Sequence, residues 1–269
     1  MTDLDIHTYW ERRLSEQYSL GGVGYLGIDE RFNAWMYRIR RRVFSREVRR
    51  AFGLRNDVSV LDIGSGTGFY LDCWHELGFA RVTGSDLTEV AVTNLRQRNP
   101  SDRIVPFDVG DAHHPFGDER FGAVSMMDVV FHIVDDERFE RAFTTAFDLL
   151  EPGGVLFFTE NFLKSTTIRL PHQVSRPMRE VTRAVTDAGL EIVRRTPVFC
   201  LMNAPLDSDS RVLRRSWRVV QGAASRRPWA ADAVGALLYP VELALVSMLS
   251  EGPSTELMVC RRPLNARRR

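Results

Sequence analysis

Residues 58–69 read VSVLDIGSGTGF, a short apolar run followed by an acid and three glycines at alternate positions. The apolar run is typical of a strand that is buried on both faces in a parallel sheet. Because glycine has no Cβ, Gly64, Gly66 and Gly68 can adopt positive φ and let the backbone around Ser65 lie against a ligand. The amides that start the following helix would then face a pocket. We expect a small molecule to bind at this turn.

The glycine spacing indicates which ligand this is. A dinucleotide-binding fingerprint requires G-x-G-x-x-G, but the position that the third glycine would need is Phe69. Asp62, two residues before the first glycine, would repel a phosphate and attract a cationic group such as the ammonium of an amino acid. The sequence therefore favours a ligand with positive charge over a pyrophosphate.

From residue 58 onward the sequence alternates between strand and helix patterns. Expected strands are 58–63, 81–85, 103–107, 121–127 and 154–160, and expected helices are 68–78, 88–98 and 136–150. A helix at 179–188 and a strand at 190–194 follow. This alternation is typical of parallel strands joined by crossover helices, so we expect an α/β, doubly wound fold.

The glycine turn resembles motif I of the class I S-adenosylmethionine-dependent methyltransferases, whose pattern is hydrophobic-Asp-hydrophobic-Gly-x-Gly-x-Gly. Later segments resemble the same family in order, at 82–87, 107–116, 121–133 and 149–160. The resemblance covers roughly residues 45–200 and implies a Rossmann-like seven-stranded sheet, closed by an antiparallel edge pair at 198–202 and 256–261. Gly122 departs from the family, in which many members carry a mainly structural acid there.

The resemblance implies S-adenosylmethionine as the cofactor and assigns residues to it. Asp86 ends the second strand, where an ionised carboxylate can accept from both ribose hydroxyls. Asp111 and Ala112 would hold the adenine through a side chain and a backbone amide. The expected cofactor-binding residues are Asp62, Gly64, Ser65, Gly66, Gly68, Asp86, Leu87, Asp111, Ala112 and Met127.

Methyl transfer from a sulfonium is an in-line displacement, so alignment of the two reactants is its main requirement. An alcohol acceptor also needs a base, and histidine suits that role near neutral pH. His132 follows the fourth strand and is either this base or a structural histidine. His172 lies in a loop that lines the acceptor pocket in the family. Asp128 has three interpretations: it orients a histidine, receives the methionine amine, or caps the next helix.

Two other groups of side chains have both a structural and a functional interpretation. His113 and His114 lie beside the adenine segment and are expected at the surface or outside direct contact. Tyr25, Trp35 and Tyr37 form either a lid on the pocket or part of the core.

Helices are expected at 8–17 and 29–52, on either side of a glycine-rich turn. We assign residues 1–52 to a helical N-terminal cap over the cleft and residues 53–269 to a methyltransferase domain with a helical insertion at 207–249. The stretch 230–249 is long enough to span a membrane, but two acids and a proline interrupt it. We expect no transmembrane segment there but a helix packed on the domain, with an interfacial helix as the alternative.

The chain of 269 residues has a net charge of +1, so no global field favours nucleic acid. Six arginines between residues 40 and 50 form either a solvated helix face or a contact for an anionic substrate or lipid. Cys73, Cys200 and Cys260 support neither a disulfide framework nor a C-x-x-C metal site, and the N-terminus does not resemble a signal peptide. A cytoplasmic location is expected.

The predicted function is metal-independent methylation, at oxygen, of a small-molecule or sugar-bearing acceptor. The two ends of the chain also resemble bacterial methyltransferases of glycans or secondary metabolites. The alternatives are N- or C-methylation of a natural product and a cofactor-binding partner protein without catalysis; an RNA methyltransferase is disfavoured because no N-P-P-Y-like motif is present. The quaternary state stays open, a homodimer included.

Overall fold

The computed structural model describes residues 5–25, 27–206 and 208–265. Their strands are β1 Val60–Ile63, β2 Val82–Asp86, β3 Arg103–Pro106, β4 Phe121–Met126, β5 Leu150–Glu160, β6 Ile168–Leu170, β7 Gln173–Ser175, β8 Glu191–Pro197 and β9 Glu256–Arg261. Their helices are α1 Ile6–Glu16, α2 Leu20–Val23, α3 Glu30–Phe52, α4 Phe69–Glu76, α5 Glu89–Arg98, the short 3-10 helix η1 Val130–His132, α6 Asp136–Leu149, α7 Met178–Asp187, α8 Arg211–Ala224 and α9 Pro228–Met248.

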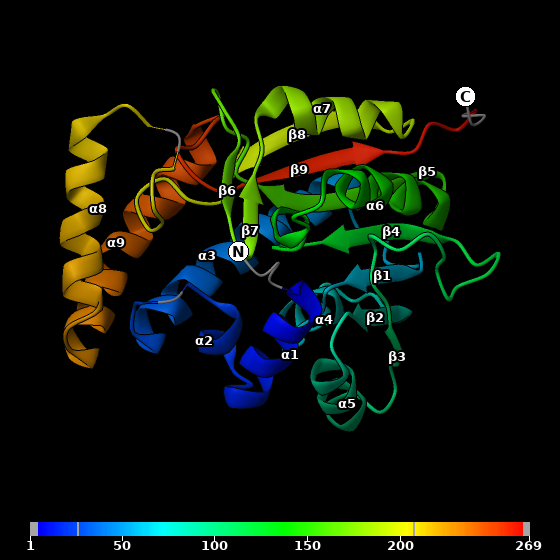
Figure 1. Cartoon of the computed structure of the whole chain (residues 1–269), viewed down its shortest axis with the longest axis horizontal. Helices are drawn as coiled ribbons and strands as arrows, with labels where there is room; N and C mark the ends of the chain where they lie inside the picture. Colours follow the sequence, from blue (N-terminus) through cyan, green and yellow to red (C-terminus); the bar gives the residue numbers. More distant parts are fainter. Residues whose placement is uncertain (1–4, 26, 207, 266–269) are drawn as a thin grey trace.

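One sheet of seven strands runs through the described part of the molecule in the order β3-β2-β1-β4-β5-β9-β8 (Figure 1). Strands β1 to β5 pair in parallel, and β9 is antiparallel to both of its neighbours. The strand order reverses between β1 and β4, and ligands of doubly wound folds bind at such a switch point. The predicted Rossmann-like seven-stranded sheet is confirmed.

The predicted edge pair is half wrong. Strand β8, not residues 198–202, pairs with β9. The reason is a buried carboxylate: Glu242 of α9 accepts from the backbone amides of Cys200, Leu201 and Met202 at 2.7, 2.8 and 3.3 Å. Because these amides are already satisfied by a side chain, the segment bends away from the sheet instead of extending it.

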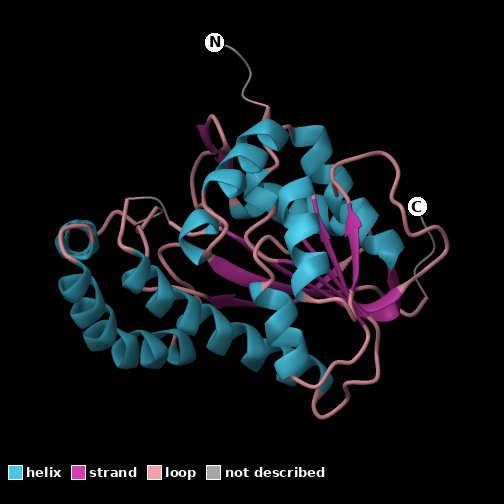
Figure 2. Ribbon diagram, turned by 90° about the horizontal axis from the view of Figure 1, so that it is seen from below, coloured by secondary structure: helices cyan, strands magenta, loops and turns pink. Residues whose placement is uncertain are grey.

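Helices cover both faces of the sheet (Figure 2). Along β1, Leu61 and Ile63 face the cluster that includes α6 and α7, while Val60 faces the cluster that includes α3, α4 and α9. This alternation is the period of two that a strand imposes on its side chains. Because α3 shares a hydrophobic cluster with β1, the N-terminal helices have no separate core; the boundary at residue 52 stays a prediction.

Helices α8 and α9 lie at one end of the molecule, inserted between β8 and β9 in sequence (Figure 1). Helix α9 packs on α3, and Gly235 of α9 lies against Trp35 of α3. A Cβ added there would lie 2.2 Å from Cδ1 of Trp35. The absence of a side chain at Gly235 is therefore what lets the two helices meet.

Replacing glycine with alanine should change the free energy of unfolding in opposite directions on the two inserted helices. Gly235→Ala should lower the free energy of unfolding by roughly 1–3 kcal/mol, because the methyl group overpacks the Trp35 ring. Gly222→Ala on α8 is the matched control, since a Cβ there meets nothing within 4 Å. It should raise stability by roughly 0.5–1 kcal/mol through helix propensity. Urea unfolding measures both, and equal effects would contradict the packing argument.

Candidate functional site

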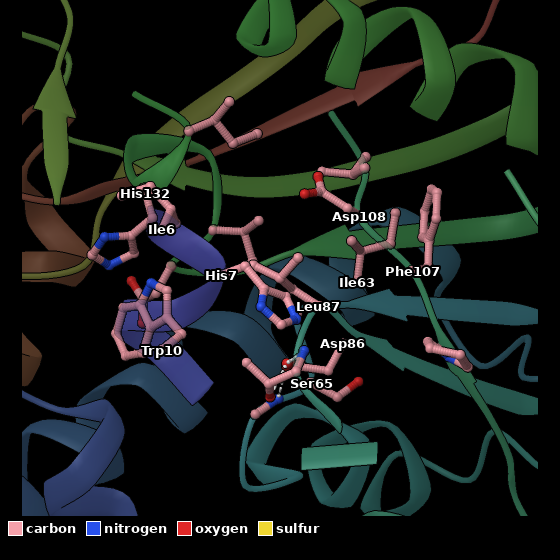
Figure 3. A pocket seen from close by; sticks show the side chains of 18 of the residues that line it. Ile6, His7, Trp10, Ile63, Ser65, Asp86, Leu87, Phe107, Asp108 and His132 are labelled. Carbon is pink, nitrogen blue, oxygen red and sulfur yellow. Dashed lines mark hydrogen bonds between the residues drawn. The ribbon is translucent and has the colours of Figure 1, made fainter. Parts of the chain in front are cut away.

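A cleft of about 1170 Å³ lies at the carboxyl ends of β1, β2 and β4, with α1 along one side (Figure 3). Ligand pockets usually measure about 300–1000 Å³, so this one has room for a nucleoside cofactor and a second small molecule. The expected cofactor residues that line it are Gly64, Ser65, Gly66, Asp86, Leu87, Asp111 and Met127. Asp62, Gly68 and Ala112 are not among its lining residues.

The turn after β1 has the backbone geometry that its glycines predict. Gly64, Gly66 and Gly68 have φ of 72°, 53° and 84°, which side chains with a Cβ rarely adopt. At Gly64 a Cβ would also lie 2.4 Å from a methyl carbon of Val129. The hydroxyl of Tyr18 donates to the Gly66 carbonyl at 2.9 Å, so the N-terminal segment holds the turn from outside.

Asp62 lies beneath this turn, away from the cleft surface. It is 1% exposed, and its Oδ1 accepts from the Ser125 hydroxyl at 2.5 Å. That hydroxyl in turn accepts from the Trp74 indole at 3.0 Å, while Oδ2 of Asp62 is buried without a partner. Burial raises the pKa of this carboxyl to about 7. The carboxylate thus retains one acceptor atom for a cationic group, although the side chain does not itself form the cleft wall.

Asp86 joins the turn to the second strand. Its Oδ2 accepts from the Gly66 amide at 2.8 Å, and its Oδ1 accepts from the Thr88 amide and hydroxyl at 2.9 and 2.7 Å. A carboxylate has about four acceptor positions, so these bonds leave about one for a ligand hydroxyl. Burial raises the pKa of Asp86, while these hydrogen bonds oppose the shift.

Where the resemblance predicts the adenine to bind, an arginine forms ion pairs with two acids. Arg138 of α6 pairs with Asp108 at 2.6 Å and with Asp111 at 3.1 Å. Asp111 is exposed, so a ligand can reach its carboxylate. His113 and His114, expected at the surface or outside direct contact, both line the cleft, and His113 is exposed. Asp108 and Arg138 were not predicted; the signal for Asp108 was its place directly after the third strand.

The two candidate histidines are in contact but are not equivalent. His132 lines the cleft, and its Nδ1 lies 2.8 Å from the backbone carbonyl of His172. A carbonyl oxygen only accepts, so Nδ1 carries the proton and Nε2 has the free lone pair. Burial lowers the pKa of His132 to about 4. The His172 ring is not among the residues that line the cleft and stacks on Tyr9 at 5.0 Å, so its role with the acceptor stays a prediction.

Asp128 lines the cleft in a left-handed conformation, with φ of 59°. Its carboxylate accepts from Arg40 at 2.8 Å and from the Thr159 hydroxyl at 3.1 Å, and its amide donates to that hydroxyl at 2.7 Å. It makes no hydrogen bond to either histidine among the described residues, and η1 has no side-chain cap. Two of its three interpretations are therefore wrong, and the reception of an amine stays a prediction.

Helix α1 supplies a wall of the cleft that the motifs did not predict: Ile6, His7, Trp10 and Leu14 (Figure 3). The Trp10 ring meets the His132 ring edge-on at 4.8 Å. Glu11 fixes the helix in place, because its carboxylate accepts from the Glu89 and Val90 amides at the start of α5 at 2.9 and 3.1 Å. The sequence predicted a helix at 8–17 within a cap over the cleft, but no fixed spacing links this helix to the glycine turn, so it did not identify which of its side chains face the cleft.

The three aromatic residues considered as a lid lie in different surroundings. Tyr37 lines the cleft, whereas Tyr25 meets the Trp217 ring and Trp35 meets α9.

Several of the arginines between residues 40 and 50 bind acids of the same chain: Arg40 binds Asp128, Arg41 binds Glu76, and Arg46 and Arg50 bind the fully buried Glu47. Among the described residues no group of three His, Cys, Asp or Glu could hold a metal ion.

Residues 61–158, which run from β1 through the glycine turn into β5, match the sequence model of a family described as a methyltransferase domain. This part of the chain thus resembles a methyltransferase domain of the class I S-adenosylmethionine-dependent superfamily in both sequence and fold. The resemblance seen in the sequence is thus confirmed. S-adenosylmethionine is the cofactor of this superfamily, and the positive-φ turn, the unpartnered Asp62 oxygen and the strand-end acids fit it.

Among curated proteins the chain is similar to a ubiquinone biosynthesis O-methyltransferase of Methylobacterium nodulans, with 38% identity over 122 residues. The match covers 43% of this chain and 45% of that protein, so the chain spans less than half the length of the relative. Among solved structures it is similar to the N-methyltransferase NodS of Bradyrhizobium japonicum in complex with S-adenosyl-l-homocysteine, at 17% identity with a TM-score of 0.53, covering 96% and 98% of the two chains.

A second solved structure, the [4+2]-cyclase SpnF, matches at 20% identity with a TM-score of 0.55, covering 82% of this chain and 80% of that one. Both likenesses show the fold alone. Because one of these proteins is a cyclase and the other an N-methyltransferase, the fold does not determine what this cleft does.

The raised pKa of Asp62 predicts a pH-dependent stability. The folded state retains a proton on Asp62 that the unfolded state releases near pH 4. The contribution of Asp62 to the free energy of unfolding is therefore fully present below about pH 4 and is lost as pH rises through about 7. Asp62→Asn should lack this loss, which is at most about 1.4 kcal/mol per pH unit. Urea unfolding between pH 4 and 8 measures the difference from the unchanged chain. The exposed Asp57→Asn is the control and should keep the original slope.

Proposed function

We propose that the chain is a methyltransferase that uses S-adenosylmethionine to methylate a hydroxyl of a small-molecule acceptor, without a metal ion. When bound, the cofactor supplies the methyl group from its sulfonium. The residues that would hold it are the turn from Gly64 to Thr67, Asp86 and Leu87 at the end of β2, and Asp111 after β3, which line the cleft, with the unpartnered oxygen of Asp62 beneath the turn. The acceptor would occupy the remainder of the cleft, beside Trp10 and His132.

The single observation that supports oxygen as the acceptor atom is the orientation of His132. The His172 carbonyl fixes the proton on Nδ1, which leaves the lone pair of Nε2 free to accept. A neutral imidazole with a free Nε2 can accept the proton that a hydroxyl must lose. The curated relative is named an O-methyltransferase, which is consistent with this assignment.

The walls of the cleft favour a compact acceptor with an apolar part. The aromatic rings of Trp10, Tyr37 and Tyr70 line the cleft, while His7 and Asp128 add polar groups. Such a mixture suits an aromatic or sugar-bearing hydroxyl compound better than a polymer. Asp128 would meet a cationic or hydroxyl group there, although Arg40 already neutralises its charge.

The cofactor assignment is tested by calorimetry with S-adenosylhomocysteine. Asp86→Asn should weaken binding by about tenfold or more, because hydrogen bonds to a charged group contribute about 1.5–3 kcal/mol. Asp57→Asn, a change of the same type at an exposed aspartate outside the cleft, should bind as the unchanged chain does. Equal affinity for the Asp86 variant, or no affinity for any of the three proteins, would refute the assignment.

The general-base assignment separates the two histidines. His132→Gln should lower kcat by roughly a hundredfold or more while affinity for S-adenosylhomocysteine is unchanged. His172→Gln is the control: because its carbonyl is retained, the loss should be much smaller. Since the pKa of His132 is about 4, kcat should show no titration of this residue between about pH 6 and 8. Full turnover by the His132 variant would instead support N- or C-methylation.

A further inference from the structure

The outer face of α9 is apolar along its whole length. Of its eleven exposed residues only Asp232 and Ser247 are polar. The large ones recur at helical spacing, and their exposed fractions range from 48% to 83%: Trp229, Leu237, Val241 and Met248. Side chains three and four apart lie on one side of a helix, so these residues form a continuous stripe. An exposed apolar stripe of this size marks an interaction surface.

The opposite face of α9 is bound to the protein. Ala231, Gly235, Glu242 and Val246 are buried, and the Glu242 carboxylate accepts from three backbone amides of the preceding segment. By length and composition alone α9 could cross a membrane, but crossing would remove these bonds. The helix is therefore held with one face on the protein and the other face outward, which is the arrangement of an interfacial helix.

Exposed arginines lie on α8, which packs against α9, and directly before the start of α9. Residues 210–231 contain six arginines and no acid, all six of them exposed: Arg211, Arg214, Arg215, Arg218, Arg226 and Arg227. In the part of the chain that the structure describes, none of them pairs with a carboxylate. Because the net charge of the chain is only +1, this basic character is local to one end of the molecule (Figure 1).

We propose that α8 and α9 form a peripheral docking surface for an anionic lipid bilayer. The apolar stripe would enter the boundary between headgroups and acyl chains, with Trp229 at the interface, and the arginines would contact lipid phosphates. A second copy of the chain fits this surface less well, because a symmetric pair would bring two sets of unpaired arginines together. This proposal goes beyond methyl transfer and does not depend on it.

Sedimentation with sucrose-loaded vesicles tests the surface, using the full chain. Vesicles of phosphatidylcholine with phosphatidylglycerol should bind it, and binding should fall at high salt. The double variant Leu237→Gln and Val241→Gln should bind roughly tenfold more weakly, because two apolar contacts with the bilayer are lost. The control is Leu54→Gln, since Leu54 is fully exposed on the loop after α3 and should not matter.

Charge is tested separately with Arg215→Gln and Arg218→Gln together. This variant should lose at least about fivefold in binding to the anionic vesicles but not to phosphatidylcholine alone, whereas Arg179→Gln on α7 should change neither. Thermal unfolding confirms that all variants remain folded. The proposal is overturned if the unchanged chain does not bind anionic vesicles or if the α9 variant binds them equally well. It is also overturned if sedimentation equilibrium shows a dimer that the α9 variant dissociates.

Discussion

The site depends on one constraint: the backbone between β1 and α4 must be held in a left-handed conformation that exposes it to the cleft. Glycines permit this conformation, but two carboxylates maintain it. Asp62 fixes the underside through Ser125, and Asp86 binds the Gly66 amide from the neighbouring strand. Both acids are buried and both have raised pKa values, so the turn is maintained at an electrostatic cost. A ligand with a cationic group would relieve part of that cost at Asp62, where one oxygen has no partner.

The second layer of the site comes from segments distant in sequence. Helix α1 contributes Trp10 to the cleft, and Glu11 anchors that helix on the amides at the start of α5. The β6–β7 hairpin contributes only a carbonyl, that of His172, yet this atom decides which nitrogen of His132 carries the proton. The chemistry of the cleft is thus set by contacts between elements, and not by a single motif.

The insertion between β8 and β9 shows how one polar side chain can shape a whole region. The Glu242 carboxylate accepts from the amides of residues 200–202. These residues therefore do not continue strand β8, and α9 is attached to the domain. A second contact of α9, Gly235 against Trp35, fixes where α9 crosses α3. Together they orient the helix so that its polar anchor points inward and its apolar stripe points outward, the reverse of an ordinary surface helix.

Local information in the sequence determined the alternation of strands and helices, the glycine turn and the acids at the strand ends, because φ preferences and side-chain periodicity act over a few residues. It also favoured an insertion at 207–249. Only the tertiary structure decided that β8 replaces 198–202 at the edge, that the His172 ring lies outside the cleft, and that Asp128 binds Arg40. Each of these depends on which partner a polar group finds across the fold, and hydrogen bonds between distant residues leave no periodic signal in the chain.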